Sequence, residues 1–135
     1  MTSTVSSELR SEPFPPISRL TLALYCGASG DHNPLHVDVD AARAAGFDDV
    51  IAHGMLPMAY LARFLDVQFG QPALRRLDVR FSAMTRVGDE LICSAERVAG
   101  GDGSDPEGVA YSVSVVDLAG EVKLAGTAVI APDAV

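Results

Sequence analysis

The chain has 135 residues, of which 48% are apolar and 21% are charged, and its formal net charge at pH 7 is −8. These values are typical of one globular domain, so we expect a single domain over residues 1–135, with residues 1–12 irregular and residues 132–135 a short tail. The acidic balance argues against a nucleic-acid partner, because binding to phosphates needs a basic face.

Two short helices and one long helix are predicted in the first half of the chain. Ser18 is a favourable N-cap for a helix that stops at two glycines, and an alanine-rich piece over residues 41–45 ends at Gly46. Over residues 54–69 apolar side chains occupy almost every face, and Pro57 falls in the first turn, where its missing donor costs nothing. This segment predicts a long central helix that other structure surrounds.

The second half of the chain changes to a two-residue period. Alternating apolar residues over residues 77–81 are followed by apolar segments at residues 91–98, 109–118 and 122–130. The connection at residues 118–121 has the length of a tight hairpin, whereas residues 100–108 form a longer acidic loop. We predict four consecutive strands in an antiparallel meander, and therefore an α+β fold whose sheet wraps around the central helix. Dimerisation would cover the part of the sheet that one layer leaves open.

The location of the protein is predicted from what the sequence lacks. Its longest apolar stretch falls short of a membrane span, and the polar first 12 residues lack the basic start and apolar core of a secretion signal. We expect no membrane contact and a cytoplasmic location. Cys26 and Cys93 are not in CxxC spacing, which favours two buried free thiols over a disulfide.

A cluster of polar residues lies between the first two predicted helices. Residues 29–36, SGDHNPLH, place a carboxylate, an amide and two imidazoles within eight positions. Asn33 and Pro34 suit the first two positions of a type I turn, which would bring His36 back towards Asp31. Two groups able to move protons would then face one small volume. The same residues are also ordinary loop composition, and the segment alone leaves both interpretations open.

This run has a counterpart in a known family. Residues 25–38, YCGASGDHNPLHVD, followed by IAHGML at residues 51–56, closely resemble the MaoC-like hot-dog proteins, which include (R)-specific enoyl-CoA hydratases and 3-hydroxyacyl thioester dehydratases. The strand segments VRF, VGD and GTA at residues 79–81, 87–89 and 126–128 fit as well. The resemblance covers roughly residues 17–131. It departs at the polar, proline-rich residues 2–16, where an apolar first strand is usual, so that strand is short or a partner completes the edge.

The resemblance implies a single hot-dog domain and a hydro-lyase of fatty acid metabolism. The implied reaction is reversible hydration of trans-2-enoyl-CoA or acyl-carrier thioesters to (R)-3-hydroxyacyl thioesters. Asp31 and His36 would bind one water and add it to one face of the double bond, with the identity of the base left open. Asn33 would orient that water, although asparagine before proline is also common for backbone reasons. The backbone N–H of Gly54, at a helix start, would stabilise the oxyanion.

Three further residues are candidates for substrate binding. His53 would be a buried, orienting residue beside the substrate, and Met55 would line an acyl tunnel unless it belongs to the core. Arg80, with Arg75, Arg76 and Arg86, offers positive charge for the phosphate of coenzyme A or of phosphopantetheine. Either group would enter as part of the substrate, and we expect no separate cofactor. The histidine spacing matches no compact ligand pattern, so we also expect no metal.

Two other functions remain open on the same fold. One is an acyl thioesterase, because fold alone does not fix function. The other is a subunit of a heterodimeric 3-hydroxyacyl-ACP dehydratase, either a non-catalytic binding or scaffold chain or, since Asp31 and His36 are both present, the catalytic chain. We expect a homodimer that acts on an acyl-CoA or acyl-ACP thioester, with a heterodimer as the alternative.

Overall fold

The computed structural model of the chain describes residues 8–98 and 108–135. Its helices are α1 (Arg19–Ser29), α2 (Val39–Ala44) and α3 (Met55–Phe69). Its strands are β1 (Glu8–Arg10), β2 (Leu74–Phe81), β3 (Ile92–Arg97), β4 (Val109–Val116) and β5 (Val122–Ile130). Two short 3-10 turns cover Pro34–His36 and Pro132–Ala134, the second within the predicted tail.

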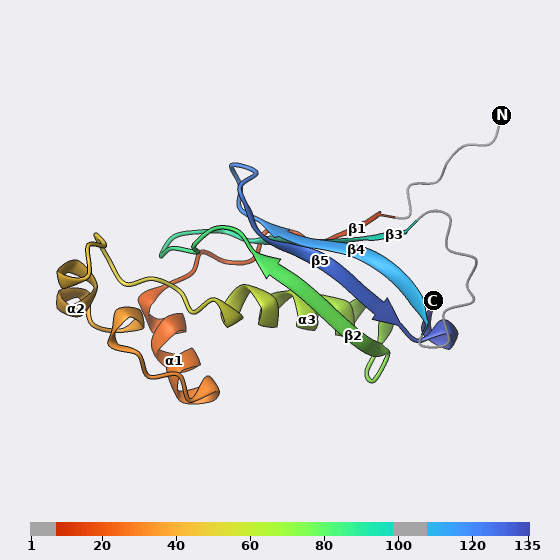
Figure 1. The fold of residues 1–135 in the computed structure, drawn as a ribbon, viewed down its shortest axis with the longest axis horizontal. Coiled ribbons are helices and arrows are strands. Elements are labelled where there is room, and N and C mark those ends of the chain that lie inside the picture. Colours follow the sequence, from red (N-terminus) through yellow and green to blue (C-terminus); the bar gives the residue numbers. More distant parts are fainter. Residues whose placement is uncertain (1–7, 99–107) are drawn as a thin grey trace.

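The five strands form one antiparallel sheet in the order β1-β3-β4-β5-β2 (Figure 1). The predicted meander is therefore wrong at its first step, because β2 pairs with β5 at the far edge and not with β3. The close approach of β2 to β5 depends on Gly126. A Cβ added at this glycine would lie 1.9 Å from the carbonyl oxygen of Asp78 on β2, so a larger residue would push the two strands apart. Alternation identifies a strand, but it does not identify the neighbouring strand.

Residues 1–12 were predicted to be irregular, and this prediction is wrong for part of the segment. Glu8–Arg10 form β1, which adds an edge strand to β3. The main chain beyond it stays attached to the sheet, since Ser11 N–H donates to the carbonyl of Cys93 and Phe14 N–H donates to that of Leu91. Backbone hydrogen bonds can form from a polar sequence, which is why the apolar pattern did not reveal this strand. Residues 1–7 lie outside the described part.

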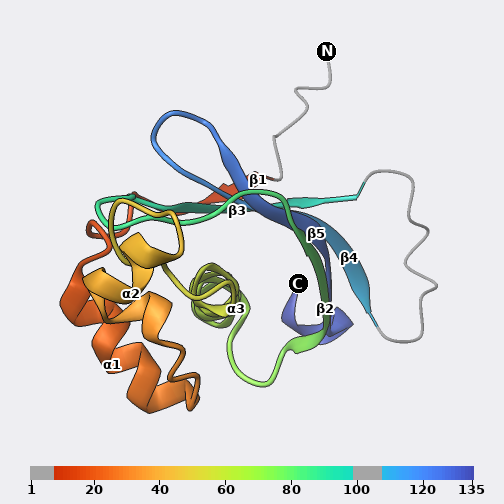
Figure 2. The ribbon, with the colours of Figure 1, turned by 60° about the vertical axis from the view of Figure 1, so that its left-hand side comes forward.

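Helix α3 lies along the concave side of the curved sheet, as the end-on view shows (Figure 2). Its buried face carries Leu56, Leu61, Phe64 and Leu65, which join strand residues such as Val113 in the core. The sequence predicted that other structure surrounds this helix on all sides, and within a single protomer this prediction is wrong. Met55 and Val67 are 54% and 73% exposed, because a single sheet covers only one side of the helix.

The predictions from capping residues and turns agree with the structure better than the prediction of which strands pair. Ser18 caps α1 by accepting a hydrogen bond from the N–H of Thr21, and Gly30 ends it with a φ of 77°. The helix predicted over residues 41–45 begins earlier, because Asp38 serves as its N-cap. The predicted hairpin joins β4 to β5, whereas the acidic loop lies outside the described residues except for its last glycine.

Both cysteines are buried free thiols, as predicted. Burial raises the pKa of the Cys93 thiol to about 12. Within residues 8–98 and 108–135, none of the helices combines the length and the apolar character needed to cross a bilayer.

Candidate active site

The turn after α1 is built by the side chains of the polar run itself. The carboxylate Oδ1 of Asp31 accepts a hydrogen bond from the N–H of Asn33 at 3.2 Å. The amide Oδ1 of Asn33 accepts in turn from the N–H of Leu35 at 3.1 Å, and the N–H of His36 donates to the Asn33 carbonyl. The last bond closes the turn predicted at Asn33 and Pro34. The oxygen of the Asn33 amide therefore caps the turn, and its catalytic role stays a prediction.

This turn brings Asp31 and His36 face to face, as the sequence predicts. His36 is buried, and its Nδ1 lies 2.7 Å from the carbonyl oxygen of Ile51. Because a carbonyl only accepts, Nδ1 carries the proton, and Nε2 of the neutral ring is an acceptor. Nε2 lies 3.7 Å from Oδ2 of Asp31, whose side chain is 55% exposed. This distance is too long for a direct hydrogen bond but suits one water bonded to both atoms.

His53 supports this pair from behind. Its ring stacks on His36 with 3.7 Å between the centroids, and its Nε2 donates to the main-chain carbonyl of Asp31 at 3.1 Å. Tyr25 meets it edge-on at 4.8 Å and the Cys26 sulfur lies 3.4 Å from Nε2. Burial lowers the pKa of His53, and the nearby His36 lowers it further, against the opposing effects of Asp31. A neutral His53 ring thus fixes the positions of Asp31 and His36.

A cleft of 440 Å³ opens beside the pair. Its lining includes His36, Gly54, Pro57 and the segment formed by residues 81–85. Gly54 is the N-cap of α3, and its N–H has no acceptor among the residues that the structure describes. The cleft therefore joins a proton-accepting imidazole to a free backbone donor at the positive end of a helix. The segment 82–85 was missed because loop residues after a strand have no periodic pattern.

The other predicted residues lie elsewhere. Met55 is exposed at the start of α3 and does not line the cleft, and His32 is exposed at the turn. Arg80 precedes Phe81 on β2, and since successive strand residues point to opposite faces, Phe81 reaches the cleft and Arg80 does not. His53 lies behind the cleft wall. The roles of these residues in substrate binding stay predictions.

Asp31, His36 and His53 also bring metal-ligand atoms within 4.8 Å of one another. Two of the four ring nitrogens already donate to carbonyl oxygens, which leaves Nε2 of His36 and Nδ1 of His53 as the ring atoms able to bind a metal. The expectation that no metal is used stays a prediction.

A curved antiparallel sheet wrapped around one helix is a hot-dog fold, and in this chain an Asp–His pair lies near the start of that helix. Comparison with known proteins agrees. Residues 1–117 match the MaoC like domain, so the chain belongs to the MaoC-like family. An R-hydratase from Pseudomonas aeruginosa, of known structure, is 27% identical with a TM-score of 0.78, covering 95% of this chain and 81% of that one. A hydratase from A. caviae, 24% identical with a TM-score of 0.80, shares the fold.

Curated relatives match a little over half of the chain. A mitochondrial 3-hydroxyacyl-[acyl-carrier-protein] dehydratase from Arabidopsis thaliana is 32% identical over 75 residues, which are 56% of this chain and 45% of that protein. An (R)-specific enoyl-CoA hydratase from Rhodospirillum rubrum is 34% identical over 77 residues, 56% of this chain and 54% of the relative. The chain thus spans about half the length of these relatives.

Proposed function

We propose that this protein reversibly hydrates trans-2-enoyl thioesters to (R)-3-hydroxyacyl thioesters, with Asp31 and His36 as the acid–base pair. The observation that carries the proposal is the 3.7 Å separation of Asp31 Oδ2 and His36 Nε2 in a site that also contains the free N–H of Gly54. A hydratase needs three groups: a base for water, a proton source for C2 and a partner for the thioester oxygen. This geometry supports all three roles.

The hydration step follows from the hydrogen-bond roles. A water between the pair donates to both acceptors, so its oxygen lone pair is free to attack C3 of the alkene. One of the two residues takes a proton from the water as the C3–O bond forms. The electrons of the double bond move through C2 to the thioester oxygen, where the N–H of Gly54 stabilises the negative charge. The enolate then collapses as C2 takes a proton from the pair on the same face.

Neighbouring residues suit the rest of the substrate. Phe81 and Met84 line the cleft with apolar side chains that are 46% and 41% exposed, which is favourable for the pantetheine arm of coenzyme A. Arg86 follows the cleft wall directly and is exposed, so it is better placed than Arg80 to meet a phosphate. The proposed assembly is a homodimer in the cytoplasm, in which a second copy covers apolar side chains such as Val67.

The test is to supply the purified chain with trans-2-butenoyl-CoA. We expect loss of the enoyl absorbance without release of free thiol, and chiral chromatography should identify the (R)-3-hydroxy product. Release of thiol without hydration would overturn the proposal in favour of a thioesterase. An inactive chain that becomes active only with a second subunit would overturn the homodimer.

A further inference from the structure

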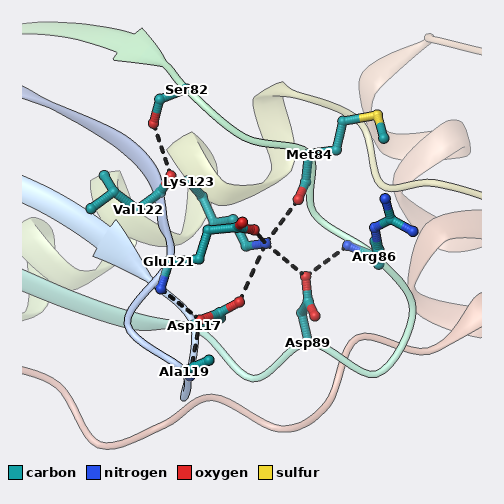
Figure 3. A network of polar contacts seen from close by, with 9 residues as sticks. All are labelled: Ser82, Met84, Arg86, Asp89, Asp117, Ala119, Glu121, Val122 and Lys123. Atoms are coloured by element: carbon teal, nitrogen blue, oxygen red, sulfur yellow. Dashed lines mark hydrogen bonds and ion pairs between the residues drawn. The ribbon is translucent and has the colours of Figure 1, made fainter.

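A buried cation lies behind the cleft. The side chain of Lys123, on β5, is only 3% exposed. Its ammonium donates to the carbonyl of Met84 at 2.8 Å and to Glu121 at 2.7 Å, and it pairs with Asp89 at 3.2 Å (Figure 3). Asp117 completes the network at 3.5 Å. The three N–H groups of the ammonium thus face four acceptor groups, three of them carboxylates, which is the arrangement that makes a buried ammonium tolerable.

The network keeps the lysine charged. Burial by itself would lower the pKa of Lys123, but the hydrogen bonds and charges of Glu121 and Asp89 outweigh it, so the pKa is raised. Removing the ammonium would leave three carboxylates facing one another with no cation between them. The position of each segment around the amine therefore depends on Lys123.

One path leads from this network to His36. The carboxylate Oδ2 of Asp89, which pairs with Lys123, also accepts the N–H of Arg86 at 2.8 Å. Arg86 forms an antiparallel bridge with Ile51. The carbonyl of Ile51 accepts the Nδ1 proton that fixes the ring of His36. Arg86 and Ile51 lie opposite each other in this bridge, which the hydrogen bond from the N–H of Ala52 to the carbonyl of Thr85 holds together, so we expect a shift of Asp89 to move the main chain of Ile51 and with it the ring of His36.

A second path leads to the wall of the cleft and to the oxyanion donor. The Met84 carbonyl held by Lys123 belongs to the cleft wall, and the next carbonyl, of Thr85, accepts the N–H of Ala52 at 2.9 Å. Ala52 stands two residues before Gly54. At the other end of the wall, Ser82 binds β5 through its N–H and its hydroxyl. The wall is therefore attached to β5 at both ends.

We propose that Lys123 is a positioning residue for the reaction, which holds the cleft wall and, through Asp89 and Ile51, sets the orientation of His36. Lys123 does not line the cleft and touches no reacting atom. The inference rests on the proposed function, and it assigns a purpose to a buried ion cluster that hydrophobic packing alone could replace without much loss of stability. A misplacement of about 1 Å can cost on the order of a hundred-fold in rate, so positioning is where its loss would show.

The test compares Lys123→Met, which keeps the length but not the charge, with Lys123→Arg. We expect Lys123→Met to lower kcat on trans-2-butenoyl-CoA by roughly ten- to a hundred-fold with a smaller change in KM. The ¹⁵N signals of His36, which report the Nδ1–H tautomer, should shift or broaden. Lys123→Arg should recover part of both. The matched control is Val113→Ala, which shortens a buried core side chain of β4 and removes no polar contact; it should lose stability but keep kcat and the His36 signals.

Wild-type kcat and wild-type His36 signals in a folded Lys123→Met variant would overturn the inference. If that variant does not fold, Asp89→Asn replaces it, because the amide oxygen can still accept the Arg86 N–H while the charge is lost. An unchanged His36 signal in Asp89→Asn likewise overturns the inference. The ¹⁵N signals need no turnover. If the wild-type chain proves inactive, the proposed function fails and these signals still decide whether Lys123 orients His36.

Discussion

Replacing Asp31 by asparagine removes one half of the acid–base pair and little else. The Oδ1 of this residue accepts the N–H of Asn33, a bond that an asparagine side chain also makes. The carboxylate is 55% exposed, so exchanging it for an amide should change the free energy of unfolding by less than about 1 kcal/mol. The turn that presents His36 is therefore expected to survive.

The catalytic loss is expected to be far larger. With Oδ1 held by Asn33, the amide nitrogen takes the place of Oδ2, 3.7 Å from the lone pair of His36 Nε2. A nitrogen donor cannot accept the proton of water and would bind His36 directly. Loss of one positioned acid–base group typically costs about 10²- to 10⁴-fold in rate, or roughly 3–5 kcal/mol in the barrier. Because the pair acts as a unit, adding His36→Gln should cost little more.

The assay is initial-rate hydration of trans-2-butenoyl-CoA, with the melting temperature measured on the same samples. Asp38→Asn is the matched control, because Asp38 also accepts a main-chain N–H through Oδ1, at the start of α2, whereas the carboxylate facing Nε2 of His36 is that of Asp31. The control variant should retain wild-type kcat. A folded Asp31→Asn variant with a kcat within threefold of wild type would refute the assignment of Asp31.

Two further outcomes are expected. A Cβ added at Gly54 would meet only Phe81, at 4.0 Å, so Gly54→Ala should fold and keep its rate. Gly54→Pro lacks the N–H and should lose about 10²- to 10³-fold in kcat. Equal rates in the two variants would exclude the oxyanion role. Burial lowers the pKa of His53 in the folded chain. At a pH below 6.5, the ordinary pKa of histidine, the unfolded chain therefore binds more protons than the folded chain, and stability decreases as the pH falls. Melting temperatures from pH 7.5 to 5.5 should fall more steeply for wild type than for His53→Gln, and parallel curves would contradict this.

The elements of the fold were predictable where a local rule decides them. Residues 122–130 were predicted as one apolar strand segment and β5 covers that range, while Ser18 and Gly30 bound α1 as capping preferences require. Pairing was not predictable. Whether β2 neighbours β3 or β5 depends on where the chain passes after residue 81, and nothing in the alternation of β2 encodes that path.

Within the site, too, some residues were predictable from a local rule and others were not. The turn that joins Asp31 to His36 follows from Asn33 and Pro34, which set the backbone locally, and its geometry was expected. The place of Arg80 was not expected, because a cluster of arginines in sequence ignores the two faces of a strand. Lys123 was not singled out at all, since a single lysine in an apolar strand gives no sign of the carboxylates that the preceding hairpin and the distant loop at Asp89 bring to it.

His53 explains why two segments separated by a helix act as one site. Its ring stacks on His36 and its Nε2 holds the main-chain carbonyl of Asp31, so it fixes both members of the acid–base pair. The next residue is Gly54, which begins α3 and lines the cleft. One peptide bond therefore connects the residue that supports proton transfer to the proposed oxyanion donor.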